Sequence, residues 1–111
     1  MIDNETIKQA TEMRKAHLNL AQYCLDKGYS ITVDYGDEDA CTKSTNYAEI
    51  KEHVEACDEA YMHIYNQEGR RIGWAWVIFG NDDNELISDY SATKFMDTWS
   101  DQFQQMYEAT A

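Results

Sequence analysis

The segment from Ile72 to Phe79 constrains the fold more than any other part of the chain. Two apolar sets alternate along it: Ile72, Trp74, Trp76 and Ile78 in one, and Gly73, Ala75, Val77 and Phe79 in the other. Because side chains alternate between the two faces of a strand, both faces here are apolar. This pattern predicts an interior strand over residues 71–79 that is at least partly covered on each side. The small residues Gly73 and Ala75 predict an element packed closely over their face.

The periodicity of the remaining apolar residues predicts three helices and three further strands. The helices are expected at residues 4–27, at 47–57 and after a cap at Ser88 or Ser91, and the strands at 29–35, 40–44 and 61–65. Gly28 is expected to end the first helix, and Asn46 followed by Glu49 is a capping-box variant. Hairpin turns are expected at 36–39 and 66–69.

The resulting element order is αββαββα. Strands come in turn-linked pairs separated by helices, which favours an α+β fold with a mostly antiparallel four-stranded sheet packed by helices. The 111 residues predict a single domain spanning 1–111. Strand 40–44 is expected at an edge protected by Lys43. A helical stripe of aromatic residues predicts that Trp99 and Phe103 are buried against the sheet.

Charge limits the classes of partner. Nine Lys and Arg residues oppose 21 Asp and Glu residues, for a net charge of −12. Direct binding of nucleic acid or of an anionic membrane requires a cationic surface, so this charge argues against both. The longest apolar run, 74–79, is too short to span a membrane, and the polar first twenty residues predict no secretory signal. The three cysteines, without C-x-x-C spacing, are expected to be reduced, and a cytoplasmic location follows.

Acidic residues concentrate in the predicted turns. The candidate partner-binding carboxylates are Asp37, Glu38, Asp39, Asp82, Asp83 and Glu85, and Asp34, Asp58, Glu59 and Asp89 lie close to them in the sequence. If the turns after the first and last strands share one end of the sheet, these residues form a continuous negative patch. Such a patch can replace DNA phosphates on a protein that grips DNA with Lys and Arg. The alternative is the ordinary polarity of solvated loops.

Aromatic residues provide a second candidate surface. Tyr61, His63 and Tyr65 fall on one face of the predicted strand 61–65, and Tyr61 and Tyr65 are the candidate partner-binding residues on it. Exposed aromatic side chains on a sheet are typical of binding sites. The alternative is that a helix covers this face.

No catalytic, cofactor-binding or metal-ligating residue is predicted, since no nucleophile elbow, phosphate-binding glycine loop or paired buried carboxylates occur. A zinc site would need His53 and Cys57, spaced i, i+4, together with Cys41 and His63 from separate elements. Residues 82–85 lack the ligand spacing of an EF-hand calcium loop. Cys41 as a nucleophile would have only Lys43 nearby in sequence to lower its pKa.

Five segments of the chain resemble small, acidic, uncharacterised proteins encoded by phages and prophages. These segments are residues 43–50, 58–59, 69–74, 79–81 and 85–91, and the resemblance spans about residues 29–91. It implies a gene of phage or mobile-element origin whose product works in the cytoplasm of a bacterial host. It brings no catalytic residues with it and does not cover the N-terminal helix or the segment after Ser91.

We therefore expect a small, non-enzymatic, phage-encoded binding protein that inhibits a host nucleic-acid-handling defence complex, of the anti-CRISPR or anti-restriction type. The acidic loops would bind a basic nucleic-acid-binding groove of a host protein as a DNA mimic. An alternative is an accessory phage protein that assembles with itself, as a homo-oligomer, or with a phage partner through exposed aromatic residues. A third hypothesis is a small enzyme that uses Cys41 or a metal.

Overall fold

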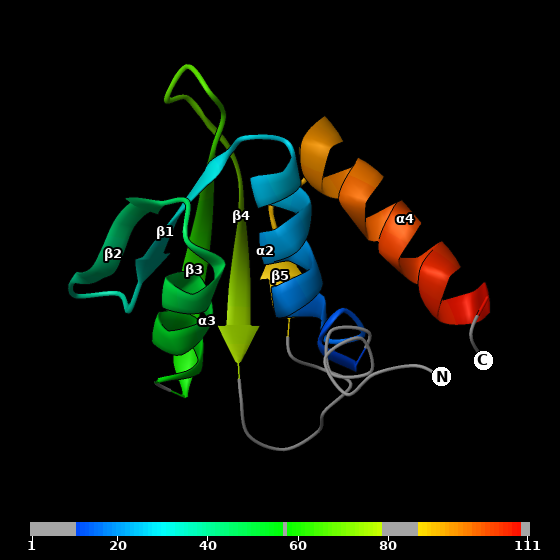
Figure 1. Cartoon of the computed structure of the whole chain (residues 1–111), viewed down its shortest axis with the longest axis horizontal. Helices are drawn as coiled ribbons and strands as arrows, with labels where there is room; N and C mark the ends of the chain where they lie inside the picture. The colour runs from blue at the N-terminus through cyan, green and yellow to red at the C-terminus, as the bar shows by residue number, and fades with distance from the viewer. Residues whose placement is uncertain (1–10, 57, 79–86, 110–111) are drawn as a thin grey trace, which may run out of the picture.

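The computed structural model of this chain describes residues 11–56, 58–78 and 87–109. The described residues form three helices and a five-stranded antiparallel sheet, which confirms the predicted α+β class (Figure 1). The elements are α2 (Ala16–Asp26), β1 (Ser30–Asp34), β2 (Asp39–Ser44), α3 (Tyr47–Glu55), β3 (Glu59–Tyr65), β4 (Arg71–Ile78), β5 (Ile87–Tyr90) and α4 (Lys94–Ala109). The strand order is β2-β1-β3-β4-β5, so β2 is an edge strand, as predicted.

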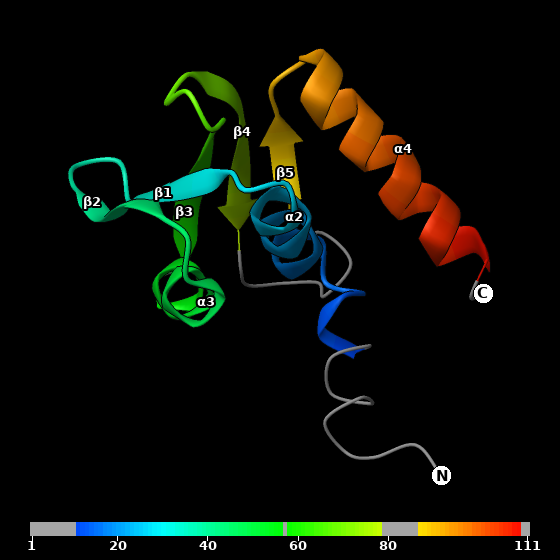
Figure 2. The same ribbon diagram turned by 45° about the horizontal axis from the view of Figure 1, so that its top comes forward.

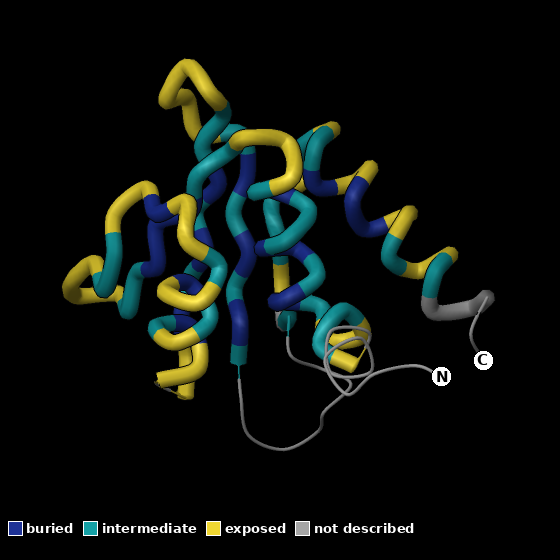
Figure 3. Tube along the Cα trace, in the orientation of Figure 1, coloured by how far each residue is buried: buried dark blue, intermediate teal, exposed yellow. Residues whose placement is uncertain are grey.

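The three helices lie over one face of the sheet. Figure 1 shows α2 and α3 in front of the strands, and in the turned view of Figure 2 both lie below the strands, with α4 to the side of α2. Alternate residues of β1, β3 and β4 face the helices, and these residues are buried (Figure 3). The core formed in this way includes Ile31, Val33, Met62, Ile64 and Val77 from the strands, and Leu20, Ile50, Val54, Met96 and Trp99 from the helices.

Strand β4 is interior, as predicted, because it pairs with β3 on one side and β5 on the other. The expected close packing over Gly73 is also found, since a Cβ atom placed there would lie 2.7 Å from Cγ of Met96 in α4. The described helices cover the Gly73 and Ala75 face, whereas Trp74 and Trp76 are half-buried on the opposite face. The prediction that each face is at least partly covered stays a prediction for this opposite face, over which no described helix lies.

The sheet has a fifth strand that the sequence pattern did not predict. Residues Ile87–Tyr90 pair with β4 through Ala75–Tyr90, Trp76–Asp89 and Val77–Ile87. This strand is only four residues long and contains Ser88 and Asp89, so its alternation is too short to distinguish it from a loop. Because these residues are in a strand, the last helix begins later than expected, and its first turn is capped by the Thr93 hydroxyl, which accepts from the Met96 amide at 3.4 Å.

The first helix is shorter than predicted. Among the described residues α2 begins at Ala16, and the preceding Lys15 has extended backbone angles. Residues 11–12 are helical and residues 13–15 interrupt the predicted helix. Just before this interruption, the Glu12 carboxylate accepts from the Tyr47 hydroxyl at 2.8 Å and from Lys51 Nζ at 2.6 Å. Residues 4–10 of the predicted helix lie outside the described part of the chain. The helix ends where predicted, with Gly28 at φ +79° and the Tyr29 amide bonded to the Cys24 carbonyl.

Local signals elsewhere in the chain worked as predicted. The Asn46 side chain accepts from the Glu49 amide at 3.1 Å and begins α3, which ends at Glu55 with Cys57 outside the described residues. In the β3–β4 turn, Gly69 has the predicted left-handed conformation with φ +82°. None of the described helices meets the length and hydropathy that crossing a bilayer requires.

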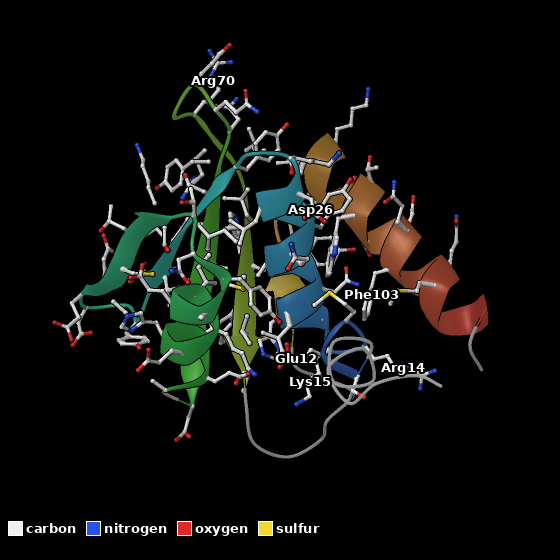
Figure 4. The ribbon with its side chains drawn as sticks, in the orientation of Figure 1. Glu12, Arg14, Lys15, Asp26, Arg70 and Phe103 are labelled. Carbon is white, nitrogen blue, oxygen red and sulfur yellow. The ribbon has the colours of Figure 1, made fainter. Side chains whose placement is uncertain are left out.

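The predicted burial of the α4 stripe holds for Trp99, which is 3% exposed, and in part for Phe103, which is half-buried. The two rings stack with centroids 5.5 Å apart. Figure 4 shows Phe103 on the side of α4 that faces α2. The indole nitrogen of Trp99 donates to Asn19 Oδ1 at 2.9 Å, so this side chain joins α4 to α2 within the core.

Candidate interaction surfaces

One end of the sheet gathers several acidic segments. Strand pairing fixes which strand termini lie together: Asp34 is aligned with Tyr61, Glu59 with Ile78, and Val77 with Ile87. The last residues of β1 and β4 and the first residues of β3 and β5 therefore lie at the same end of the sheet. The β1–β2 turn and the α3–β3 connection are therefore neighbours there. We call the exposed residues Asp37, Glu38, Asp39, Asp58 and Glu59 the acidic end.

The β1–β2 turn is held by local hydrogen bonds. Asp34 Oδ1 accepts from the Gly36 amide at 2.7 Å, and the Tyr35 amide donates to the Glu38 carbonyl at 2.9 Å. Gly36 supplies the left-handed conformation, with φ +103°. These bonds use the Asp34 side chain and backbone groups, so the exposed carboxylates of residues 37–39 stay directed to solvent.

The other predicted acidic segment, Asp82, Asp83 and Glu85, lies outside the described residues. The described residues on either side of it, Ile78 and Ile87, are both at the acidic end. Strands β1 and β4 therefore end at the same end of the sheet, and the part of Asp82, Asp83 and Glu85 in a negative patch stays a prediction.

The opposite end of the sheet is basic. Arg70 lies at the tip of the β3–β4 turn (Figure 4). Gln67 in this turn donates to the Lys27 carbonyl at 3.0 Å, and Lys43 Nζ lies 3.7 Å from where a Gly69 Cβ would be. Lys27, Lys43, Arg70 and Arg71 therefore gather at this end and outnumber the exposed carboxylates there, Asp26 and Glu68, so charge is distributed unevenly along the strands.

The sheet face opposite the described helices carries the aromatic residues. Tyr61, His63 and Tyr65 of β3 lie beside Trp74 and Trp76 of β4, and all five are half-buried. We call these five residues the aromatic face. Sequence reasoning identified the β3 residues but missed the two tryptophans, which it placed under a covering layer. The predicted hairpin of strands 61–65 and 71–79 was the signal that could have placed the two tryptophans beside Tyr61 and Tyr65.

Polar contacts hold the aromatic side chains in place. The Trp76 indole nitrogen donates to Glu59 Oε1 at 2.7 Å, and His63 Nε2 lies 3.2 Å from Asp34 Oδ2. On the basic side, Arg71 Nη1 lies 3.4 Å from His63 Nδ1. Lys43 Nζ lies 4.8 Å from the Tyr65 ring centroid, which is a cation–π contact. The aromatic face therefore connects the acidic end to the basic end.

Burial raises the pKa of the thiols of both described cysteines. Cys24 is fully buried in the core, and burial raises its pKa. Cys41 is half-buried on β2, and desolvation raises the pKa of its thiol, with the carboxylates of Glu49 and Asp39 raising it further. A raised pKa keeps the thiol protonated at neutral pH. Within the described residues, no three His, Cys, Asp or Glu side chains are grouped as metal ligands.

No family model, curated protein or solved structure matches this chain.

Proposed function

We propose that this protein is a small, non-enzymatic, phage-encoded inhibitor that binds a host protein of a nucleic-acid-handling defence complex through its acidic end. The observation that carries the proposal is the convergence of carboxylates from the β1–β2 turn and the α3–β3 connection at one end of the sheet. A basic groove that holds DNA phosphates with Lys and Arg would accept this surface.

The form of the acidic end supports this function. Its carboxylates are exposed, and the hydrogen-bonded turn that carries three of them is preorganised, which reduces the entropy lost on binding. The basic groups lie at the opposite end of the strands, so they do not neutralise the acidic end. The surface that a partner would contact is therefore more uniformly negative than the composition of the whole chain implies.

The experiment uses the purified protein as bait in a bacterial host lysate, followed by affinity measurement on each captured protein across a salt series. We expect the dissociation constant to increase steeply with salt. A single Asp37→Asn change should weaken binding less than about five-fold, because one exposed pair contributes ~0–1 kcal/mol. Replacing Asp37, Glu38, Asp39, Asp82, Asp83 and Glu85 with Asn or Gln should weaken it cumulatively and flatten the salt dependence.

A matched control removes acidic charge elsewhere. The changes Asp26→Asn, Glu68→Gln and Asp101→Asn alter three exposed residues outside the acidic end, and they should leave the affinity nearly unchanged. The effect of these three changes on affinity is compared with that of the triple change at residues 37–39, because both variants remove three negative charges. DNA should compete with the protein for the groove if the carboxylates occupy phosphate positions. Unchanged affinity after the six-residue replacement and after the further changes Asp58→Asn and Glu59→Gln, in a protein that still folds, would reject the acidic end as the binding surface.

The alternative function, an accessory phage protein that assembles through aromatic residues, is favoured by a different observation: the half-exposed aromatic face on the side of the sheet away from the described helices. The two functions use different surfaces, and the substitutions above separate them. Loss of binding in Tyr61→Ala or Tyr65→Ala, with full binding after the six acidic replacements, would assign the contact to the aromatic face.

A further inference from the structure

The aromatic face is ordered in three rows that cross the strands. In the first row, Asp34, Tyr61, Trp76 and Asp89 are aligned partners on β1, β3, β4 and β5. In the second row, Thr32, His63 and Trp74 are aligned. In the third row, Ser30, Tyr65 and Arg71 are aligned, with Lys43 over the Tyr65 ring. The first row therefore has an acidic residue at each end, whereas the third row carries two basic groups.

Three rings of the first two rows, those of Tyr61, Trp76 and His63, are stacked with Tyr61 in the middle. Tyr61 and Trp76 have centroids 6.0 Å apart and planes 9° apart, and Tyr61 and His63 have centroids 6.3 Å apart and planes 21° apart. The Glu59 and Asp34 contacts fix Trp76 and His63. Rigid aromatic side chains lose little conformational entropy on binding, so this face is suited to pack against another flat surface.

We propose that two copies of this chain form a dimer through their aromatic faces, related by a two-fold axis that runs across the strands along the His63–Trp74 row. This axis reverses the strand direction between the copies. The first row of each copy then lies against the third row of the other. Each strand then faces the same strand of the other copy. Arg71 on β4 of one copy therefore lies close to Asp89 on the neighbouring strand β5 of the other copy. Lys43 on β2 lies close to Asp34 on the neighbouring strand β1 of the other copy for the same reason. Each contact occurs twice, as a two-fold interface requires.

The size of the sheet is compatible with such a dimer. Five strands about 4.8 Å apart and a seven-residue β3 rising about 3.3 Å per residue give a face of roughly 24 by 23 Å. Two such faces have a combined projected area of roughly 1,100 Å², near the lower limit for a specific interface. The net charge of −12 on each copy opposes association at low salt. We therefore expect a reversible dimer that is best observed near physiological ionic strength.

Sedimentation equilibrium of the purified full chain, over a concentration series at about 0.15 M salt, where the Debye length is about 8 Å, tests the dimer. The parent should show a mass rising from 12.9 kDa toward twice that value. Arg71→Glu should weaken the dimer at least ten-fold, because the introduced carboxylate would then lie opposite Asp89 of the other copy. Asp89→Arg should weaken it similarly, by placing two guanidinium groups opposite each other. Residues 71 and 89 are exposed, and circular dichroism checks that each variant folds.

Mixing the two variants is the decisive measurement. In the mixed dimer each altered residue lies opposite a group of the other sign, so Arg71→Glu and Asp89→Arg together should restore association to near the parental level. Asp101→Asn on α4 is the control and should not change association. A parent that stays monomeric throughout the series, or a dimer that both variants leave intact, would overturn the proposal. Failure of the mixture to associate would also overturn it. None of these results depends on a host partner, so this test is independent of the proposed inhibitor function.

Discussion

At the scale of single residues, His17 has the most unusual environment. It lies in α2, is 1% exposed, and its Nε2 atom is 2.7 Å from Glu55 Oε2 of α3. Burial lowers the pKa of this imidazole, and the opposing effect of the Glu55 carboxylate is smaller. The neutral ring, donating to Glu55, is thus the form that the folded chain accommodates. Glu55 is 38 residues from His17 in the sequence, so no local pattern links the two.

This lowered pKa predicts how stability depends on pH. The unfolded chain binds a proton at His17 near its ordinary pKa of 6.5, whereas the folded chain resists that proton. The unfolded state therefore holds more protons below that pH. We expect the stability from neutral His17 to be fully present above about pH 6.5 and to be lost as the pH falls through that value toward the lower folded pKa.

Urea unfolding between about pH 8 and pH 5.5 measures this effect, since most carboxylates stay ionised in that range. In His17→Leu the decline of the unfolding free energy over this interval should be much smaller. His53→Gln removes a histidine from α3 without touching the pair, and it should keep the parental slope. An identical slope in His17→Leu and the parent would mean that another group causes the pH dependence.

At the scale of elements, the contact between β4 and α4 depends on the absence of a side chain at Gly73. A Cβ atom there would lie 2.7 Å from Cγ and 3.0 Å from Sδ of Met96, which is fully buried. Gly73→Ala should therefore destabilise the protein by about 1–3 kcal/mol through overpacking. Chemical denaturation measures the change.

The Gly73→Ala prediction has an internal control in Met96. Met96→Ala alone should be destabilising by about 2–5 kcal/mol because it leaves a cavity. In the double variant the added methyl group occupies part of that cavity, so its destabilisation should be smaller than the sum of the two single effects. Strict additivity would show that Met96 does not confine residue 73.

Elements with many residues and clear periodicity could be predicted from the sequence, and elements defined by distant contacts could not. Strand β4 and helix α3 were predictable because alternation and the Asn46 cap are local signals. The interruption before α2 has no local sequence signal, and the neighbouring Glu12 binds Tyr47 and Lys51, which are 35 and 39 residues away. Strand β5 depends on pairing with β4 more than on its own four residues.

The candidate surfaces show the same division. The acidic segments and the tyrosines of β3 could be identified from composition and alternation. Whether the acidic turns share one sheet end depends on strand order, which follows from the pairing of β1 with β3, where Asp34 contacts His63 from 29 residues away. The exposure of Trp74 and Trp76 depends on which sheet face the helices cover, and the doubly apolar β4 pattern does not determine that face.

At the scale of the whole molecule, charge is separated along the strands. The acidic end holds the carboxylates of residues 37–39 and 58–59, and the basic end holds Lys27, Lys43, Arg70 and Arg71. In the proposed dimer the two strand directions are opposed, so the acidic ends would lie at opposite ends of the assembly. Each acidic end would then lie beside the basic end of the other copy, so we expect self-association and binding of a basic groove to compete with each other.

Crowding of like charge at one end also predicts how salt affects stability. With a net charge of −12, repulsion among carboxylates should destabilise the folded chain more than the described ion pairs stabilise it. Raising NaCl from about 20 mM to about 500 mM shortens the Debye length from about 20 Å to about 4 Å. We expect the melting temperature to rise by several degrees over this range, measured by circular dichroism at fixed protein concentration.

Two variants test whether the acidic end is the source of that salt effect. Neutralising Asp37, Glu38 and Asp39 together should raise the melting temperature at low salt and reduce the gain on adding NaCl, because less repulsion remains to be screened. Lys27→Gln combined with Arg70→Gln should enlarge the gain, since it removes charges that offset the acidic end. A melting temperature that falls with salt in the parent would mean that attractive pairs such as Glu12–Lys51 dominate. A gain unchanged by the triple neutralisation would place the repulsion elsewhere in the chain.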